Sequence, residues 1–550
     1  MKKFFSLLLA LLMLAIMLPM VALAEDEAGT PAGTDNNPVE VWTGFIGSKV
    51  ASYASIEEAV ENLGVNKWIL IAKDYTLEND FTITDGVFLD VASGATLTVK
   101  EGVTLTVAAN AKRLGIRDGG TIINNGTIMV CGTNNNSSKL MRQSNGTLAG
   151  KSLSVPNGYF LDNDGGMNNF FATEISKAVY EITFTDGTVK LSANSTNVTG
   201  NVKQVKLLAD VVVGGWSAGT FINTDWVLDL NGHTISNTGA DYTALNISNT
   251  KMTIKNGTVK YTGAAKGAIM VYGNAELTIA PDAVIEGGNG YGIFTSGTSN
   301  LIVYGEVRSS GEYAITGNGK RDTEGEESDK DDIDNCNITI QNGAVVSAPN
   351  GIAIYHPELG TVTINGGNIT GHTGVEMCAG KLVVNGGNIT STGDNFDATG
   401  SQNAIKDGAA ISIINRDYPG GIPTAEIKGG TIKATGTGAF AVKAYDYTNN
   451  TVADWETAPQ HVTVTGGIFS GKNEAIVRLI PEGYVKNPYN DTDVIVKPST
   501  ITIIVPSTEE TPKPAEDQKN PATGANDLVG VAAAAAVVAL LGTAAVLRKK

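Results

Sequence analysis

The chain has 550 residues, of which 65 are glycine and only three are cysteine, and it carries a formal net charge of −17. Glycine is well above its usual share of about 7%, and three cysteines in a chain of this length do not make a disulfide framework. A strongly acidic surface repels nucleic acid and anionic lipid, so the charge argues against a nucleic-acid-binding protein.

The N-terminus has the pattern of a secretory signal. Two lysines precede a long apolar run, and Ala22 and Ala24 supply the small residues of a cleavage site. We therefore expect a signal peptide over residues 1–24 and a flexible N-terminus over residues 25–40.

One short helix is expected near the N-terminus. In "SIEEAVENLG", Ser55 and Glu58 form a capping box, apolar residues share one face, and Gly64 marks the end. This helix precedes the apolar strand "WILIA" and fits a cap on an N-terminal solenoid module over residues 41–135. A polar connecting segment, residues 136–180, follows.

The stretch "FINTDWVLDLNGHTI" contains Asn223-Thr224-Asp225, which resembles the first catalytic signature of polygalacturonases. The segment that starts at Trp68 has the same order of residues, with Thr84-Asp85 at the matching place but Ile83 where the asparagine would stand. A turn into a strand explains both copies, because Thr and Asp hydrogen-bond to their local backbone.

The other pieces of a polygalacturonase site are missing. Asp331-Asp332 lies more than a hundred residues beyond Asp225, His372 lacks the second flanking glycine, and no Arg-Ile-Lys follows. An inverting glycosidase needs its two carboxyl groups about 6.5 to 9.5 Å apart. We therefore assign no catalytic residue.

From about residue 250 a unit recurs: a short alternating strand, Asn or Gly, and a second short strand, as in "ITIQNGAVV" and "VTINGGNIT". Most steps between units are about 20 to 25 residues, and the longer steps carry insertions. The central apolar residues of eight units are Ile254, Ile279, Val303, Ile340, Ile364, Val384, Ile427 and Val464.

The repeats predict an all-β fold, a right-handed parallel β-helix with coils of 20 to 25 residues. Gly and Asn tolerate the positive φ that its corners need, and alternation directs Ile, Val and Leu inward. The main β-helix is expected over residues 181–500, with a departing β element at its end. Coils stacked at about 4.8 Å would form a stiff rod.

The loop "GKRDTEGEESDKDDIDN" is expected to be a solvated insertion between coils. It is not an EF-hand, because Ile333 takes a ligand position. We expect no cofactor, and weak calcium binding remains the open alternative. Its candidate ligands are Asp329, Asp331, Asp332 and Asp334.

The remaining candidate residues are histidines, cysteines and aromatics. The four histidines have no metal-binding spacing; we expect His233 at a corner, His356 in a loop and Cys378 in a buried strand. Aromatic residues near corners could stack on sugar rings or contact a host protein. They are Trp216, Trp226, Tyr272, Tyr291, Tyr304, Tyr313 and Tyr355.

The C-terminus carries a Pro-rich spacer over residues 501–519, the pentapeptide "NPATG", an apolar run over residues 528–547 and a basic end. This order resembles the sorting signal of Gram-positive surface proteins, whose usual form is LPxTG. The resemblance implies that a sortase cuts between threonine and glycine and joins the threonine to peptidoglycan, so that the apolar run holds the chain in the membrane only transiently. The motif residues are Asn520, Pro521, Ala522, Thr523 and Gly524.

Phrases such as "LLADV" and "VLDLNGHTI" resemble the pectin-lyase-like β-helix superfamily as it occurs in clostridial-type surface proteins. The resemblance covers about residues 40–500 and implies the fold more strongly than an activity. We expect a secreted protein anchored to the cell wall that serves adhesion or display, with a polysaccharide or host ligand as partner. The alternatives are an extracellular polysaccharide lyase or hydrolase, and a structural wall protein without a ligand.

Overall fold

A computed structural model describes residues 36–133, 139–163, 169–194, 200–214, 216–217, 225–263, 266–319, 334–396, 404–416, 418, 420–448 and 451–499. For residues 216, 217 and 448 it describes the backbone alone. The predicted signal peptide and sorting signal lie outside these residues, as do Asn223, Thr224, Asp329, Asp331 and Asp332.

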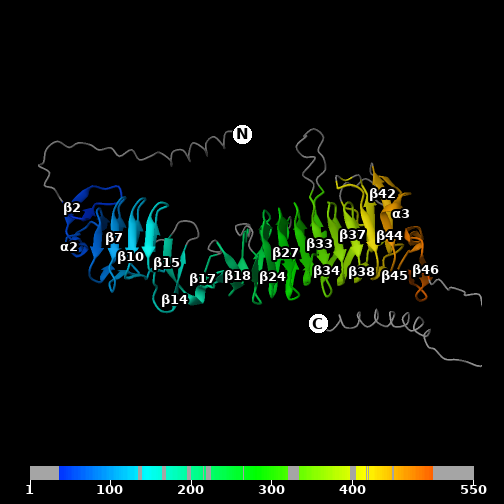
Figure 1. The fold of residues 1–550 in the computed structure, drawn as a ribbon, viewed down its shortest axis with the longest axis horizontal. Coiled ribbons are helices and arrows are strands. Elements are labelled where there is room, and N and C mark those ends of the chain that lie inside the picture. Colours follow the sequence, from blue (N-terminus) through cyan, green and yellow to red (C-terminus); the bar gives the residue numbers. More distant parts are fainter. Residues whose placement is uncertain are drawn as a thin grey trace, which may run out of the picture. The chain divides into compact units, whose positions relative to one another are not determined.

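The described part of the chain is mostly β-structure, and most of its strand pairs are parallel (Figure 1). This confirms the all-β prediction. The helices are short: α2 (Ile56–Glu61), η1 (Ile175–Lys177), α3 (Ala458–His461) and η3 (Glu474–Leu479).

Three sheets build a first stack of strands. The eight-stranded sheet has the order β14 (Tyr159–Asn163), β15 (Asn169–Glu174), β12 (Lys139–Arg142), β9 (Arg113–Ile116), β6 (Phe88–Val91), β3 (Trp68–Ile71), β1 (Val39–Trp42), β2 (Lys49–Tyr53). The four-stranded sheet has the order β13 (Thr147–Gly150), β10 (Thr121–Asn124), β7 (Thr96–Val99), β4 (Tyr75–Leu77). The three-stranded sheet has the order β11 (Thr127–Val130), β8 (Thr104–Val107), β5 (Phe81–Ile83). From β3 onward the chain visits the three sheets in turn.

Two sheets build a second stack. The twelve-stranded sheet has the order β17 (Val189–Ser192), β16 (Tyr180–Phe184), β18 (Val202–Leu207), β21 (Asp225–Asp229), β24 (Lys251–Lys255), β27 (Glu276–Ile279), β30 (Asn300–Val303), β33 (Asn337–Ile340), β35 (Thr361–Ile364), β37 (Lys381–Val384), β40 (Thr424–Ile427), β44 (Val462–Val464). The twenty-stranded sheet comprises β19 (Val211–Val212), β20 (Trp216–Ser217), β22 (Thr234–Asn237), β23 (Leu245–Ser248), β25 (Gly257–Tyr261), β26 (Gly267–Tyr272), β28 (Ala283–Glu286), β29 (Tyr291–Thr295), β31 (Glu306–Arg308), β32 (Tyr313–Gly317), β34 (Val345–His356), β36 (Asn368–Met377), β38 (Asn388–Ser391), β39 (Ile411–Asn415), β41 (Thr431–Ala434), β42 (Val442–Thr448), β43 (Thr451–Asp454), β45 (Gly467–Ser470), β46 (Tyr484–Pro488) and β47 (Val494–Pro498).

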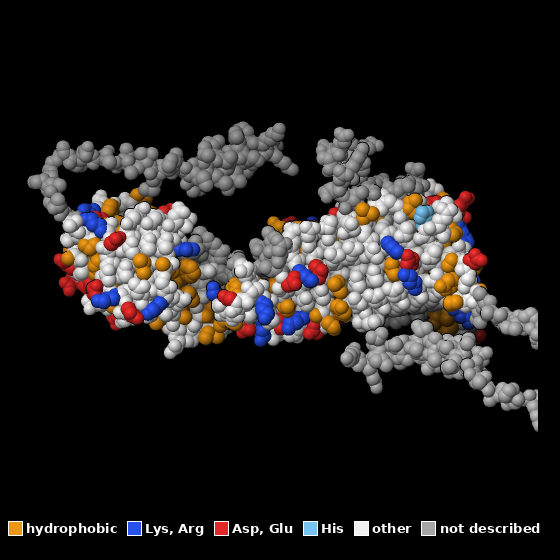
Figure 2. All heavy atoms as spheres, in the orientation of Figure 1, with side chains coloured by type: hydrophobic (Ala, Val, Ile, Leu, Met, Phe, Trp, Pro, Cys, Tyr) orange, Lys and Arg blue, Asp and Glu red, His pale blue; other side chains and the backbone are white. Residues whose placement is uncertain are grey.

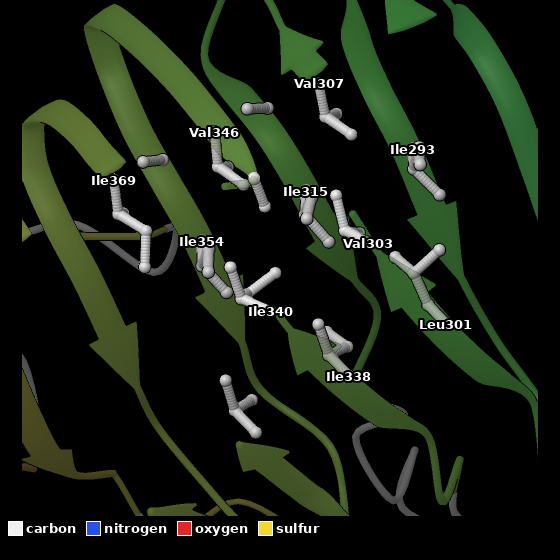
Figure 3. Close-up of a cluster of buried hydrophobic side chains, with 14 of the residues drawn as sticks. Ile293, Leu301, Val303, Val307, Ile315, Ile338, Ile340, Val346, Ile354 and Ile369 are labelled. Atoms are coloured by element: carbon white, nitrogen blue, oxygen red, sulfur yellow. The ribbon is translucent and has the colours of Figure 1, made fainter. Parts of the chain in front are cut away.

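The eight apolar residues that the repeats single out lie in one row of the second stack. Ile254 pairs in register with Ile279, that residue pairs with Val303, and the row continues without a break to Val464. All eight side chains are fully buried. In Figure 3 residues of this row point toward apolar side chains of the opposite sheet, such as Ile315 and Ile354. The predicted repeat spacing is therefore the spacing of successive parallel strands.

Antiparallel strands flank the parallel ones at the start and end of each stack. At the two starts, β1 pairs with β3, and β16 pairs with β18. At the two ends, β15 pairs with β12, and β47 pairs with β45. The strands β46 and β47 are the departing β element that the sequence predicts.

The predicted cap helix is present as α2. The Ser55 hydroxyl accepts a hydrogen bond from Glu58 N at 3.1 Å, and the Glu58 carboxylate accepts one from Ala54 N at 3.1 Å. Ile56 and Ala59 are fully buried on the face toward the first stack. The helix therefore covers the end of that stack's apolar interior.

Each stack has its own hydrophobic core. One cluster of buried residues runs from Val39 to Leu140, and another runs from Tyr180 to Val496. Asp162 of β14 accepts hydrogen bonds from Ser192 Oγ at 3.0 Å and Ala193 N at 3.1 Å, which links the two stacks. The link is polar, whereas the interior of each stack is apolar.

Candidate functional site

The described residues of the two Thr-Asp motifs lie in a turn and at the start of a strand. Val87 N donates to Thr84 O at 3.2 Å, which closes a turn before β6. Asp225 is the exposed first residue of β21. In both copies the aspartate that follows the motif is buried: Asp90 pairs with Arg113, and Asp229 pairs with Lys255. The repeated pattern thus marks structural positions.

Asp334, the one calcium candidate among the described residues, lies almost fully buried. Its Oδ1 accepts a hydrogen bond from Gly297 N at 2.8 Å, so the carboxylate fixes a neighbouring turn. Within the ranges that the structure describes, no group of three or more His, Cys, Asp or Glu side chains is placed to hold a metal ion.

One position differs from the expectations, and two of the aromatic candidates are buried. His356 does not lie in a loop; it ends β34, fully buried, with Nε2 3.1 Å from the Cys336 carbonyl oxygen. Trp226 is buried because the alternation of β21 turns it inward. Tyr355 faces outward from β34, but a second layer of side chains covers it. By contrast, Tyr304 is exposed beside its turn.

An aromatic band runs along the outer face of the twenty-stranded sheet. The ring centroids of Tyr291 and Phe294 lie 5.3 Å apart, and those of Tyr313 and Tyr355 lie 5.5 Å apart. The hydroxyl oxygens of Tyr355 and Tyr418 are 3.4 Å apart. The Arg416 guanidinium carbon lies 5.0 Å from the ring centroids of both Tyr418 and Tyr447. We use the name aromatic band for these six aromatic residues.

A buried acidic pair lies beside the band. Both oxygens of the Glu376 carboxyl group accept from Ile405 N at 3.0 Å. The Asp407 carboxylate accepts from Ser412 Oγ at 2.6 Å and from Ala409 N at 2.9 Å. Burial, and then the charge of Asp407, raise the pKa of Glu376 to about 8. These bonds hold residues 404–409 over β36 and β39.

An open cavity of about 480 Å³ adjoins this covering segment. It combines one exposed aromatic ring, that of Phe396, with charged, amide and imidazole groups. Ile405 belongs both to its wall and to the buried layer that contains Tyr355. The cavity is lined by His372, Asp394, Asn395, Phe396, Ala404, Ile405 and Lys406.

A second open cavity, of about 600 Å³, lies on the first stack over β4, β7, β10 and β13. Its described wall consists of threonine, asparagine, lysine, glutamate and glycine, and it includes no aromatic residue. Lys100 on this wall already pairs with Glu78. Aromatic rings supply much of the affinity of sugar and protein interfaces, so the cavity beside Phe396 is the stronger candidate.

Charge is distributed in small mixed groups. Figure 2 shows a face on which positive and negative side chains lie next to one another between larger uncharged areas. Glu286, for example, pairs with both Lys260 and Arg308. Such mixed groups do not generate the single-sign field that would attract a polyanion.

Sequence analysis missed the acidic pair and the cavity. The signal for Glu376 is a lone acid inside the apolar run "GVEMCAG", and the signal for Asp407 is an acid next to glycine in "AIKDGAA". Phe396 carries no comparable signal, since a lone phenylalanine in a polar stretch has many explanations.

Comparison with protein-family models, with curated proteins and with solved structures gave no match. Among the described residues, no helix combines the length and the apolar character needed to cross a bilayer.

Proposed function

We propose that this chain is a surface protein anchored to the cell wall, whose stacked sheets form a right-handed parallel β-helix that displays a ligand-binding face. The observation that carries the binding role is the open cavity on the twenty-stranded sheet, where the exposed Phe396 ring lies beside hydrogen-bonding groups. Exposed aromatic rings beside hydrogen-bonding groups are the usual composition of a recognition surface.

The anchoring role rests on the C-terminal pattern. The order of spacer, "NPATG", apolar run and basic end resembles a sortase signal, and the pattern at residues 1–24 supplies a route out of the cell. Sortase and peptidoglycan are the partners that this reading implies. The Pro-rich spacer would separate the binding face from the wall.

A polysaccharide-degrading enzyme is the second candidate, and one observation favours it. Glu376 on β36 and Lys443 on β42 lie on either side of β39, and Asp407 and Arg416 lie just before and just after β39. Carboxyl groups with raised pKa values, such as those of Glu376 and Asp407, are frequent in active sites. However, both carboxyl groups are fully buried and hydrogen-bonded to residues 404–409 or to adjacent side chains. A glycosidic bond could reach them only if the covering segment moved, so binding is the better reading.

Polymer size and polymer retention separate these two functions. The purified chain is mixed, with and without calcium, with plant, mucin and wall polysaccharides, and each polymer is followed by size-exclusion chromatography. We expect at least one polymer to co-elute intact with the protein. A polymer that the wild-type chain shortens but the Glu376→Gln variant leaves at full length would establish the enzyme instead. Polymers that neither bind nor shorten would contradict a glycan-binding role.

Thr523 provides the test of anchoring. If a sortase joins this residue to peptidoglycan, the variant Thr523→Ala should leave the wall fraction and accumulate in the membrane fraction or the medium. Immunoblots of separated wall, membrane and medium fractions measure this. Thr511→Ala, a change in the spacer, is the matched control and should stay in the wall. Equal wall fractions for the two variants would refute the proposed attachment residue.

A further inference from the structure

The residues on one side of the cavity, Asp394 to Phe396, are fixed by backbone contacts. Thr437 N donates to Asp394 Oδ1 at 2.6 Å, and Asn395 N donates to Thr437 O at 2.9 Å. Phe396 N donates to Asp407 O at 3.2 Å. The Asp394 carboxylate and the backbones of Asn395 and Phe396 are therefore held in place before any ligand arrives, which reduces the entropy lost on binding.

The orientation of the Asn395 amide is also fixed. Lys443 Nζ donates to Asn395 Oδ1 at 3.2 Å, and it lies 3.4 Å from the Phe396 carbonyl oxygen. Since the Asn395 amide oxygen accepts from the Lys443 ammonium group, the amide nitrogen points away from Lys443 and can act as a donor to a ligand. Asp394 presents acceptors and Asn395 presents a donor side by side.

An apolar surface completes the cavity. The Phe396 side chain is 54% exposed, although the backbone on which it stands is pinned, and Ala404 and Ile405 line the same cavity. A carboxylate, an amide and an exposed ring suit a ligand with hydroxyl groups on its edge and C–H groups on its face. A pyranose sugar has this chemistry.

His372 lies on the cavity wall because residue 393 is glycine. A Cβ at position 393 would stand 2.2 Å from His372 Cε1, so any larger residue would displace the imidazole ring. His372 Nδ1 is buried and has no hydrogen-bond partner among the described residues. A buried polar atom of this kind gains from a partner that a bound molecule brings.

The Asp394 carboxylate disfavours a ligand that would place an acidic group beside it. The hydrogen bond from Thr437 lowers the pKa of Asp394, so its carboxyl group is ionised at neutral pH. Lys406 is the other charged residue of the described wall, and Lys443 lies against Asn395, so the discrimination acts beside Asp394 and not through the net charge of the cavity. A second carboxylate beside Asp394 would be repelled, whereas hydroxyl groups would be accepted.

We infer that this cavity binds one neutral sugar residue, with two adjacent hydroxyl groups on Asp394 and Asn395 and the ring against Phe396. The inference rests on the proposed binding function and names its ligand class. It differs from binding along the aromatic band, because the cavity holds a single residue and excludes uronates.

Methyl glycosides of galactose, glucose, mannose and galacturonic acid test the inference. The purified full chain is titrated with each glycoside up to about 10 mM, a range that covers the weak affinities expected of single sugars, and binding is followed by ligand-observed NMR. We expect at least one neutral glycoside to bind and the uronide to bind at least about tenfold more weakly. Phe396→Ala and Asp394→Asn should each weaken binding at least about tenfold.

Tyr489→Ala is the matched control, because Tyr489 is 56% exposed, directly follows β46 and is not part of the cavity wall. It should leave binding unchanged, and unfolding curves of all variants check that each is folded. Tighter binding of the uronide would overturn the neutral-sugar inference, and unchanged binding by Phe396→Ala would overturn the site. Absence of any glycoside binding would overturn the inference alone, since polymer retention and wall attachment are measured separately.

Discussion

Glu376 is buried beneath Ile405, and its protonation should make the stability of the protein depend on pH. Its pKa is about 8 in the folded chain, against an ordinary value of 4.5. The folded chain therefore holds a proton that the unfolded chain releases as pH rises through this window. The contribution of Glu376 to stability is therefore fully present below pH 4.5, and it is lost as pH rises from 4.5 to 8.

We expect Glu376→Gln to remove this part of the pH dependence. The glutamine oxygen still accepts from Ile405 N, but the side chain no longer ionises. Denaturant unfolding at several pH values from 5 to 7.5 should give a free energy of unfolding that falls less steeply in the variant, by about 1.4 kcal/mol per pH unit.

Glu426 supplies the control for this measurement. Lys381 and Lys428 lower its pKa to about 2, so it stays ionised throughout the same range. Glu426→Gln should leave the slope unchanged. If the free energy of unfolding falls equally steeply with pH in Glu376→Gln and in the wild-type chain, the carboxyl group of Glu376 is not protonated at neutral pH.

The burial of individual side chains was the feature of the structure that the sequence predicted least well. The alternation of inward and outward side chains correctly predicts that the row from Ile254 to Val464 is buried, because this alternation is a local property of each strand. It fails for Tyr355, which points outward but is covered by a segment about fifty residues further along the chain, near Ile405. Such cover depends on tertiary contacts that no local pattern encodes.

At the scale of elements, β33 offers a comparison between its two faces. Ile340 is fully buried between Val303 and Ile364 of the neighbouring strands, whereas Thr339 faces outward and is partly exposed. We expect Ile340→Ala to cost about 2–5 kcal/mol of stability, because it leaves a cavity in a packed interior.

Thr339→Ala should change the stability by no more than about 0.5 kcal/mol. Chemical denaturation of both variants measures the difference. Similar costs for the two substitutions would mean that the two faces of the strand are not packed as described.

The elements themselves were well predicted where the repeat is regular. The helix α2 and the row of eight strands were expected from capping and periodicity, and a β element was expected at the C-terminal end, where the structure has the hairpin of β46 and β47. The acidic loop before Asn335 and the cover around Asp407 were not interpretable in this way, since insertions follow no period. The candidate site lies beside one of these insertions, which is why the sequence did not reveal it.

At the scale of the whole molecule, the two hydrophobic cores predict two unfolding events. The core of the first stack includes Leu105 and that of the second includes Ile340, and the two clusters share no residue. Hydrogen bonds to the Asp162 carboxylate link the stacks, but hydrogen bonds to a charged group contribute only about 1.5–3 kcal/mol each.

Differential scanning calorimetry should therefore resolve two transitions. Leu105→Ala should lower the midpoint of one transition by several degrees, and Ile340→Ala should lower that of the other. A single transition that both variants shift equally would show that the stacks unfold as one cooperative unit.

The flanking antiparallel strands have a consequence for how such a chain can evolve. In both stacks the strands at the boundaries differ from the parallel strands between them, while neighbouring internal repeats such as "VTINGGNIT" and "LVVNGGNIT" are nearly interchangeable. Unequal recombination between two such repeats would add or delete a whole repeat and leave both boundaries intact. The length of such a protein can therefore change in whole repeats while the antiparallel strands at its boundaries stay the same.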